Sequence, residues 1–168
     1  VNISLDTLDA ERYAQITGHT GPAVPELLRT LEKCRSAGLK TKINTVILPS
    51  GREDWKELAG LAKQGTDVRF IELMPVGAGA ALERVAYHEV LSTLKQYWPD
   101  LHPVEEIRGN GPAQYWGSRE LTGRIGFIHA VSDRFCDRCN RVRLTAAGFL
   151  KPCLCYEQGV ELRHMLRD

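Results

Sequence analysis

The first 74 residues switch repeatedly between two hydrophobic periods, and this switching limits the possible folds more than any other feature of the sequence. Apolar residues recur at every second position, as in β-strands, over 1–5, 40–48 and 67–73. Between these segments, apolar residues follow helical spacing over 24–34 and 55–62. Strands that alternate with helices in this way are typically parallel and joined by crossover helices. The sequence therefore predicts an α/β fold.

One face of the predicted strands is polar. Asn2, Ser4 and Asp6 lie in phase on the first strand, and Lys42 and Asn44 lie in phase on the second. A parallel strand covered by helices on both faces would be apolar throughout. The polar face therefore indicates a lumen or cleft that holds a ligand, as in a barrel. Three strands cannot close a barrel and the chain begins inside a strand, so we expect the beginning of the protein to be missing.

The pattern changes after Met74. A glycine-rich loop leads to one helix that ends before Pro99. Short strands then follow at 104–107, 114–116, 125–131, 142–145 and 149–154, with a turn at 109–112. The tail over 160–166 has the spacing of another helix. We therefore predict two domains: a partial barrel over 1–76, made of its last three parallel strands, and a mainly antiparallel α+β region over 77–168.

Charge and hydropathy limit the partners that we expect for this chain. The 22 basic and 21 acidic side chains give a formal net charge of +1 over 168 residues. This balance leaves little long-range field for holding nucleic acid over the whole surface, so we expect any anion site to be local. No stretch approaches the roughly 20 apolar residues that span a bilayer, and the start lacks a basic and apolar leader. We expect a cytoplasmic protein with neither nucleic acid nor membrane as its partner.

Four of the five cysteines are crowded into one short stretch. Two residues separate Cys136 from Cys139, thirteen separate Cys139 from Cys153, and Cys155 follows closely. An odd number of crowded cysteines is not typical of the paired framework of a small disulfide protein. A hairpin through Gly148 would return the later thiols toward the first pair. The sequence therefore predicts a metal site in a reducing compartment.

The cysteines alone leave the identity of the metal open. Four thiolates, with Cys155 as the fourth, make a closed zinc site, whereas three bind a 4Fe-4S cluster that leaves one iron open. Arg141 and Arg143 lie beside this site and, on a strand, point to the same side. Paired guanidinium groups suit a phosphate or a purine edge. The alternative is a solvated strand face with weak ion pairs.

Several motifs together resemble the carboxy-terminal part of the family of GTP 3',8-cyclases, which are radical S-adenosylmethionine enzymes of molybdenum cofactor biosynthesis. The most specific are 135–145 (FCDRCNRVRLT), Gly148 and 151–154 (KPCL). The others, in the same order as in that family, are 2–6 (NISLD), 42–46 (KINTV), 69–74 (RFIELM) and 111–113 (GPA). The resemblance covers essentially the whole chain.

The resemblance implies a radical S-adenosylmethionine barrel, whose first 4Fe-4S cluster cleaves the cofactor, and a second 4Fe-4S cluster that holds GTP. A 5'-deoxyadenosyl radical takes hydrogen from ribose C3', and the sugar radical attacks guanine C8. The product is (8S)-3',8-cyclo-7,8-dihydroguanosine 5'-triphosphate.

The same resemblance assigns roles by motif position. The second cluster is ligated by Cys136, Cys139 and Cys153. GTP is bound by Lys42, Arg141, Val142 and Arg143, and S-adenosyl-L-methionine is bound by Ser4 and Met74. Without the resemblance, Lys42 would be interpreted as a solvated lysine at a strand end, Ser4 as a locally bonded serine and Met74 as a core residue.

Two departures from the family pattern keep alternatives open. The first-cluster cysteines and the family's double-glycine tail do not occur in this sequence, so we expect the chain alone to be inactive and to hold no catalytic residue. Cys155 stands where the family usually has an aromatic or aliphatic residue. The alternatives are a zinc-stabilised module that binds nucleic acid or a phosphoprotein, and a GTP-binding remnant without catalysis. The family also implies a homodimer and, as the next enzyme of its pathway, cyclic pyranopterin monophosphate synthase.

Overall fold

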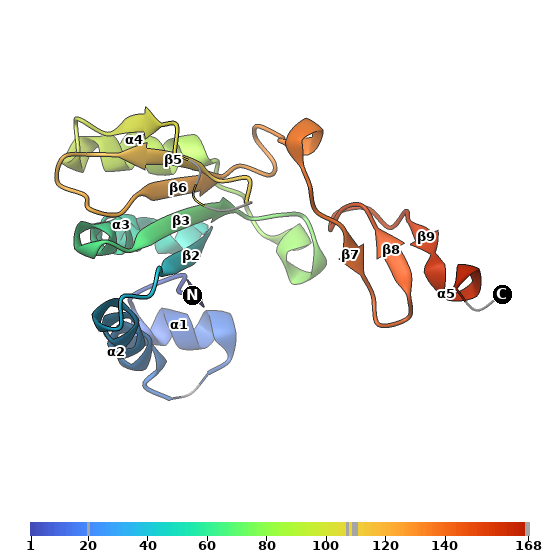
Figure 1. Cartoon of the computed structure of the whole chain (residues 1–168). Helices are drawn as coiled ribbons and strands as arrows, with labels where there is room; N and C mark the ends of the chain where they lie inside the picture. Colours follow the sequence, from blue (N-terminus) through green and yellow to red (C-terminus); the bar gives the residue numbers. More distant parts are fainter. Residues whose placement is uncertain (20, 107, 109–110, 167–168) are drawn as a thin grey trace. The chain divides into compact units, whose positions relative to one another are not determined.

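A computed structural model describes residues 1–19, 21–106, 108 and 111–166 (Figure 1). The chain divides into two compact units. The sheet unit comprises Val1–Leu73 and Glu83–Arg134, and the cysteine unit comprises Met74–Leu82 and Phe135–Asp168. Both units are therefore discontinuous in sequence, and the chain passes between them three times. This division differs from the predicted functional division at residue 76.

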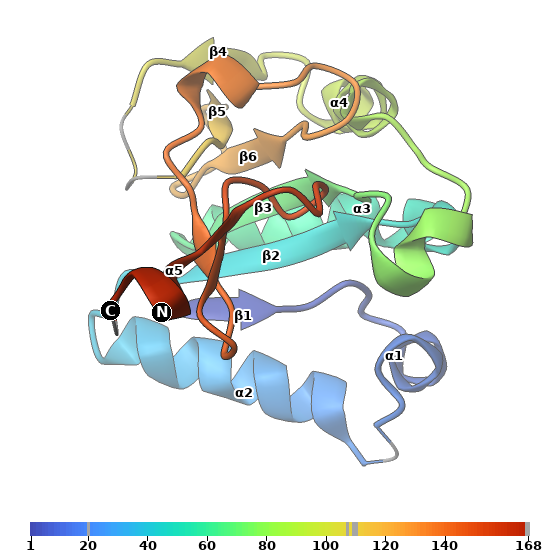
Figure 2. The same ribbon diagram turned by 90° about the vertical axis from the view of Figure 1, so that its right-hand side faces the viewer.

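The sheet unit contains a six-stranded sheet with the order β1-β2-β3-β6-β5-β4, stacked in this order in Figure 2. The strands are β1 (Asn2–Ser4), β2 (Lys42–Ile47), β3 (Asp67–Glu72), β4 (His102–Val104), β5 (Gln114–Gly117) and β6 (Ile125–Ile128). β1, β2, β3 and β6 pair in parallel, whereas β5 is antiparallel to both β6 and β4. The three predicted parallel neighbours are confirmed. The sheet is open, with β1 and β4 at its edges, so the barrel stays a prediction.

The second half of the chain is mainly antiparallel, as predicted, but it differs from the prediction in two details. β6, within the predicted strand 125–131, pairs antiparallel with β5 on one side, but on its other side it pairs in parallel with β3. Ile125, Gly126 and Phe127 are all buried, which suits an internal strand with covered faces. The predicted strand over 104–107 is displaced, because β4 ends at Val104. Ile107, and Gly109 and Asn110 of the predicted turn, lie outside the described residues.

Four α-helices connect the parallel strands: α1 (Ala10–Thr17), α2 (Ala23–Ser36), α3 (Trp55–Gly60) and α4 (Tyr87–Tyr97). The 3-10 turns η1 (Pro49–Asp54) and η2 (Leu61–Gln64) flank α3. The periodicity predicted α2, α3 and α4 but not α1. The signal for α1 is Asp9, whose side chain accepts a hydrogen bond from the Arg12 backbone N–H at 2.7 Å and so caps the helix.

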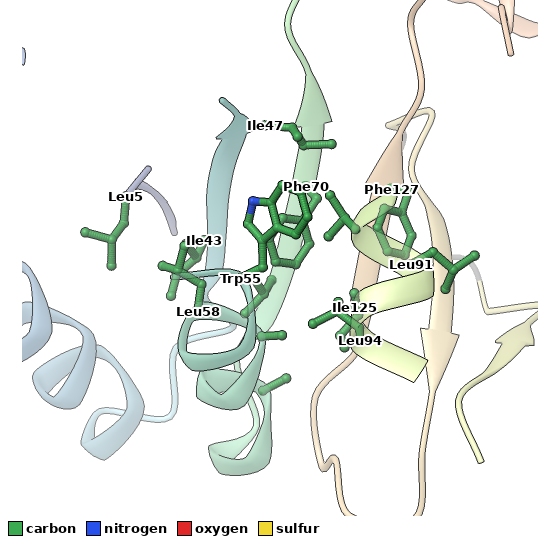
Figure 3. Packing of buried hydrophobic residues seen from close by; sticks show 14 of the residues in the cluster. Leu5, Ile43, Ile47, Trp55, Leu58, Phe70, Leu91, Leu94, Ile125 and Phe127 are labelled. Atoms are coloured by element: carbon green, nitrogen blue, oxygen red, sulfur yellow. The ribbon is translucent and has the colours of Figure 1, made fainter. Parts of the chain in front are cut away.

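The hydrophobic core lies between one face of the sheet and the helices. Alternate residues of the inner strands are fully buried there, and Figure 3 shows them meeting side chains of α3 and α4. The Phe70 and Phe127 rings stack across β3 and β6 with their centroids 5.9 Å apart. On α3, Trp55 and Leu58 close the centre of this core. Burial of these large side chains supplies the main driving force for folding.

The residues between these core positions form the polar face of the sheet, which we define as Asn2, Ser4, Lys42, Asn44, Asp67 and Arg69. The register pairs Ser4 with Asn44 and Asn44 with Arg69. Residues paired in this way point to the same side of the sheet. The prediction that Ser4 and Lys42 lie on the side opposite the helix-covered core is therefore confirmed.

The cysteine unit contains a three-stranded antiparallel sheet with the order β7-β8-β9. Its elements are η3 (Gly77–Ala81), η4 (Cys136–Arg138), β7 (Arg143–Leu144), β8 (Phe149–Lys151), β9 (Val160–Glu161) and α5 (Leu162–Met165). The predicted hairpin through Gly148 is confirmed, because β7 pairs with β8 and Gly148 has a φ of 88°. Among the described helices of both units, none is long and apolar enough to cross a membrane.

Candidate functional site

Lys42 begins β2 on the polar face, and its ammonium group is held by other residues of the sheet unit. Lys42 Nζ donates to the backbone carbonyl of Arg108 and to the hydroxyl of Tyr115 at 3.3 Å. Nζ also lies 5.6 Å from the centroid of the Tyr115 ring, within the range of a cation–π contact. The interpretation of Lys42 as a solvated strand-end lysine is therefore wrong. Its ammonium is fixed in place from two sides.

A charged network extends from this point along the start of β3. Asp67, which is buried, accepts a hydrogen bond from Arg108 Nη1 at 2.6 Å and another from the Arg124 backbone N–H at 3.1 Å. Glu106 pairs with both Arg124 and Arg108. Hydrogen bonds from Arg124 and Arg108 hold the pKa of Glu106 below its ordinary value. The network anchors the segment that carries the carbonyl partner of Lys42.

Two polar atoms on the polar face have no partner among the described residues. They are Asn44 Oδ1 and Arg69 Nε, both buried. The Arg69 guanidinium is only partly used, since its Nη2 donates to Asn2 Oδ1 at 2.8 Å. Buried polar groups are normally hydrogen-bonded. These two groups therefore have unused hydrogen-bonding capacity on the polar face.

Ser4 and Met74, the two residues implied in S-adenosyl-L-methionine binding, belong to different units. Ser4 is exposed at the end of β1, on the polar face. Met74 is the first residue of the cysteine unit and is half-buried, and its carbonyl accepts the Val76 N–H at 2.8 Å. Their joint role stays a prediction.

The thiols of the cysteine unit are arranged as two local pairs. Cys136 and Cys139 are exposed. Cys136 begins η4 and Cys139 directly follows it, and the turn closes with a hydrogen bond of 3.1 Å from the Cys139 N–H to the Cys136 carbonyl. The half-buried Cys153 accepts the backbone N–H of Cys155 on its sulfur at 3.4 Å. In the second pair, a backbone N–H is thus directed at a sulfur, a contact that helps to orient a cysteine ligand.

The predicted convergence of Cys136, Cys139 and Cys153 on one centre is not present in this structure. Within the described residues, no three His, Cys, Asp or Glu side chains form a group that could hold a metal ion. Metal binding and the ordering of the ligands are coupled, so ligands assemble together with their metal. The donor chemistry nevertheless fits an iron–sulfur cluster or zinc, because thiols alone make up the set. The ligand assignment stays a prediction.

Arg141, Val142 and Arg143 follow the first thiol pair and are exposed. Among the ion pairs of the described residues, none involves Arg141 or Arg143. β7 begins only at Arg143, so Arg141 precedes the strand. Val142 is 67% exposed. These three residues are therefore accessible to a ligand.

Sequence reasoning missed Tyr115, Asp67 and Arg108 as neighbours of Lys42. Tyr115 reaches Lys42 by crossing β6 at Gly126, its register partner. A Cβ at Gly126 would lie 2.9 Å from Tyr115 Cε1 and 3.0 Å from Arg69 Cγ. The glycine therefore leaves room for both side chains. The signal in the sequence is a glycine inside an apolar strand, which indicates close approach.

These features define a mixed α/β protein whose parallel sheet has one polar face and whose separate antiparallel unit carries the thiols. The chain belongs to the Molybdenum Cofactor Synthesis C family, whose model matches residues 66–168. This finding confirms the resemblance to the carboxy-terminal part of the cyclase family.

Individual relatives match over nearly the full length of the chain. It is 43% identical over its whole length to a GTP 3',8-cyclase of Clostridium perfringens and 40% identical to one of Pelotomaculum thermopropionicum. It is 41% identical, over 99% of its length, to a GTP 3',8-cyclase of Paracoccus denitrificans. The matches cover 52%, 53% and 49% of these relatives. The chain therefore spans about half the length of the curated relatives it matches.

Proposed function

We propose that this chain is the substrate-side, carboxy-terminal part of a GTP 3',8-cyclase and acts in molybdenum cofactor synthesis. The observation that carries the proposal is the similarity of the whole chain to proteins of that name, at 43% identity in one case. The thiol-rich unit and the polar face, with its partly unused hydrogen-bonding groups, support it. The complete protein would convert GTP to (8S)-3',8-cyclo-7,8-dihydroguanosine 5'-triphosphate.

In this proposal Cys136, Cys139 and Cys153 hold a 4Fe-4S cluster. Such a cluster, when bound by three thiolates, supplies one iron to which a purine can coordinate. Arg141 and Arg143 would bind the nucleotide through bidentate, charge-assisted hydrogen bonds, with Val142 between them. Their exposure and lack of ion pairs among the described residues support this role.

The polar face would contribute Lys42 and Ser4. Lys42 would place one positive charge against GTP, and its contacts with Tyr115 and the Arg108 carbonyl restrict the ammonium before the ligand arrives. Ser4 and Met74 would bind S-adenosyl-L-methionine, which supplies the organic radical of this family. The residues of this chain would thus bind and orient, while the radical source would lie in the other half of the complete protein.

A second candidate is a zinc-stabilised binding module. It is favoured by one contact, the N–H of Cys155 on the sulfur of Cys153, which places the backbone of the fourth cysteine beside the third thiol. A GTP-binding remnant without catalysis is the third. Assembly as a homodimer and delivery of product to cyclic pyranopterin monophosphate synthase are proposals for the complete protein.

Replacement of single cysteines in the full-length protein distinguishes these candidates. After anaerobic reconstitution, Cys153→Ser should contain about four fewer irons per chain than the wild type and should lose GTP cyclisation. Cys155→Ser and the matched control Cys34→Ser should keep both. Iron, sulfide and zinc analysis and a product assay provide the measurements.

Two results would contradict the proposal. A colourless protein with one zinc per chain, in which Cys155→Ser loses metal as readily as Cys153→Ser, would establish the zinc module. A wild-type protein that carries the cluster and binds GTP but releases no cyclised product would establish the remnant.

A further inference from the structure

Glu72 lies beside all three places where the chain passes between the two units. The chain leaves the sheet unit after Leu73, returns at Glu83 and leaves again after Arg134. Glu72 is the last residue of β3 and directly precedes Leu73. Its partners come from the segments next to the other two passages. Tyr87 follows the return at Glu83 by four residues, and Val131 and Ser132 shortly precede Arg134.

The Glu72 carboxylate uses both oxygens to hold these segments. Oε1 accepts the Tyr87 backbone N–H at 3.0 Å and the Ser132 hydroxyl. Oε2 accepts the backbone N–H groups of Val131 and Ser132, each at 2.9 Å. The residue is only 3% exposed. A buried carboxylate is costly unless hydrogen bonds compensate its charge, and here neutral donors do so.

The ionisation of Glu72 agrees with this geometry. Burial by itself raises the pKa of the carboxyl, but hydrogen bonds from Ser132, Tyr87 and Val131 together outweigh it and lower the pKa. The charged form is therefore the one that the surrounding donors are arranged to bind.

We infer that Glu72 is a positioning residue whose carboxylate holds together, within the sheet unit, the three segments that connect to the cysteine unit. Met74 follows Glu72 by two residues, and Cys136 follows Ser132 by four. The carboxylate thereby fixes the starting points of the segments that carry Met74 and the first thiol pair. We expect loss of the carboxylate to weaken GTP binding, because small displacements of binding groups strongly reduce productive binding. This expectation rests on the proposed function.

Hydrogen exchange in the full-length protein tests the structural part of the inference. In Glu72→Ala, the Tyr87, Val131 and Ser132 amides should all exchange at least about tenfold faster. In Glu72→Gln, the new NH2 group should face the Ser132 hydroxyl, which can accept its hydrogen bond, so Tyr87 alone should lose protection. Glu120→Gln, at an exposed ion pair with Lys63, is the matched control and should change none of the three.

Titration with GTP tests the functional part. The EPR signal of the reconstituted protein should respond to GTP in Glu72→Gln only at about tenfold higher concentration, with unchanged iron content. The inference would be overturned if the three amides of Glu72→Ala exchanged as slowly as in the wild type. It would also be overturned if the Tyr87 amide of Glu72→Gln exchanged faster while the EPR response to GTP stayed normal. If Glu72→Ala does not fold, Glu72→Gln decides alone. Failure of the wild type to cyclise GTP would overturn the proposed function and leave the exchange result valid.

Discussion

At the scale of single residues, Tyr115 joins the polar face to Lys42 through one hydroxyl and one ring. Tyr115→Phe keeps the ring and removes the hydrogen bond, so we expect a loss of about 1 kcal/mol in the free energy of unfolding. Tyr97→Phe is the matched control, because Tyr97 is exposed and its ring contacts Trp98 and Lys56. Urea unfolding of the two variants measures the difference. Equal midpoints would show that the hydroxyl of Tyr115 contributes nothing to the fold.

A residue's role could be predicted where it follows from neighbouring residues in the sequence, and not where it depends on contacts between distant segments. Lys42 and Ser4 were assigned to the polar face because strand periodicity is local. Tyr115 was not found, because its contact with Lys42 requires the order of strands β2, β3, β6 and β5. The two local thiol pairs likewise follow from spacing, whereas convergence of the thiols depends on the metal.

At the scale of elements, Gly123 allows β6 to begin beside β3. Its N–H donates to the Ala62 carbonyl at 2.8 Å, and a Cβ there would lie 2.1 Å from the Thr66 carbonyl oxygen. Gly123→Ala should therefore destabilise the sheet unit by about 2 kcal/mol or more. Gly60→Ala, in α3, meets no atom within 4 Å and should stabilise by roughly 0.5–1 kcal/mol. Thermal unfolding measures both, and a harmless Gly123→Ala would show that β6 can shift.

The elements that local patterns predict best are those with long, regular periods. β2, β3, α2 and α4 have such patterns and were found. The parallel pairing of β6 with β3 was not predicted, because a short apolar strand carries no information about which distant strand it will join. Its neighbour β3 lies more than fifty residues earlier, and pairing over that distance depends on the packing of the helix-covered core.

At the scale of the whole molecule, the carboxyls of the buried Glu72 and the half-buried Asp6 give opposite responses to acid. The pKa of Glu72 is lowered in the fold, so its contribution is complete above about pH 4.3 and is lost as the pH falls through the lowered pKa. Burial raises the pKa of Asp6, although its hydrogen bond from the Val46 N–H at 2.7 Å opposes this. Its protonated form is therefore favoured in the fold, and its penalty applies at neutral pH and disappears in acid.

Two variants test these opposite changes of stability with pH. Between pH 7 and pH 3, Glu72→Gln should lose less unfolding free energy than the wild type. Asp6→Asn should be more stable than the wild type at pH 7, and this advantage should shrink at pH 3. Urea unfolding at both pH values provides the measurement. Parallel pH profiles for all three proteins would mean that neither carboxyl governs the response to acid.

Because the two units are discontinuous in sequence, the arrangement also limits how such a protein can evolve by recombination. Residues 83–134 separate the two stretches of the cysteine unit, so no recombination event can transfer that unit as a contiguous gene segment by itself. Any segment that carries both stretches also carries α4, β4, β5 and β6. The family match over 66–168 includes all of them, together with β3. The thiol-bearing unit can therefore diverge by substitution, but it can be inherited only together with half of the sheet from which it emerges.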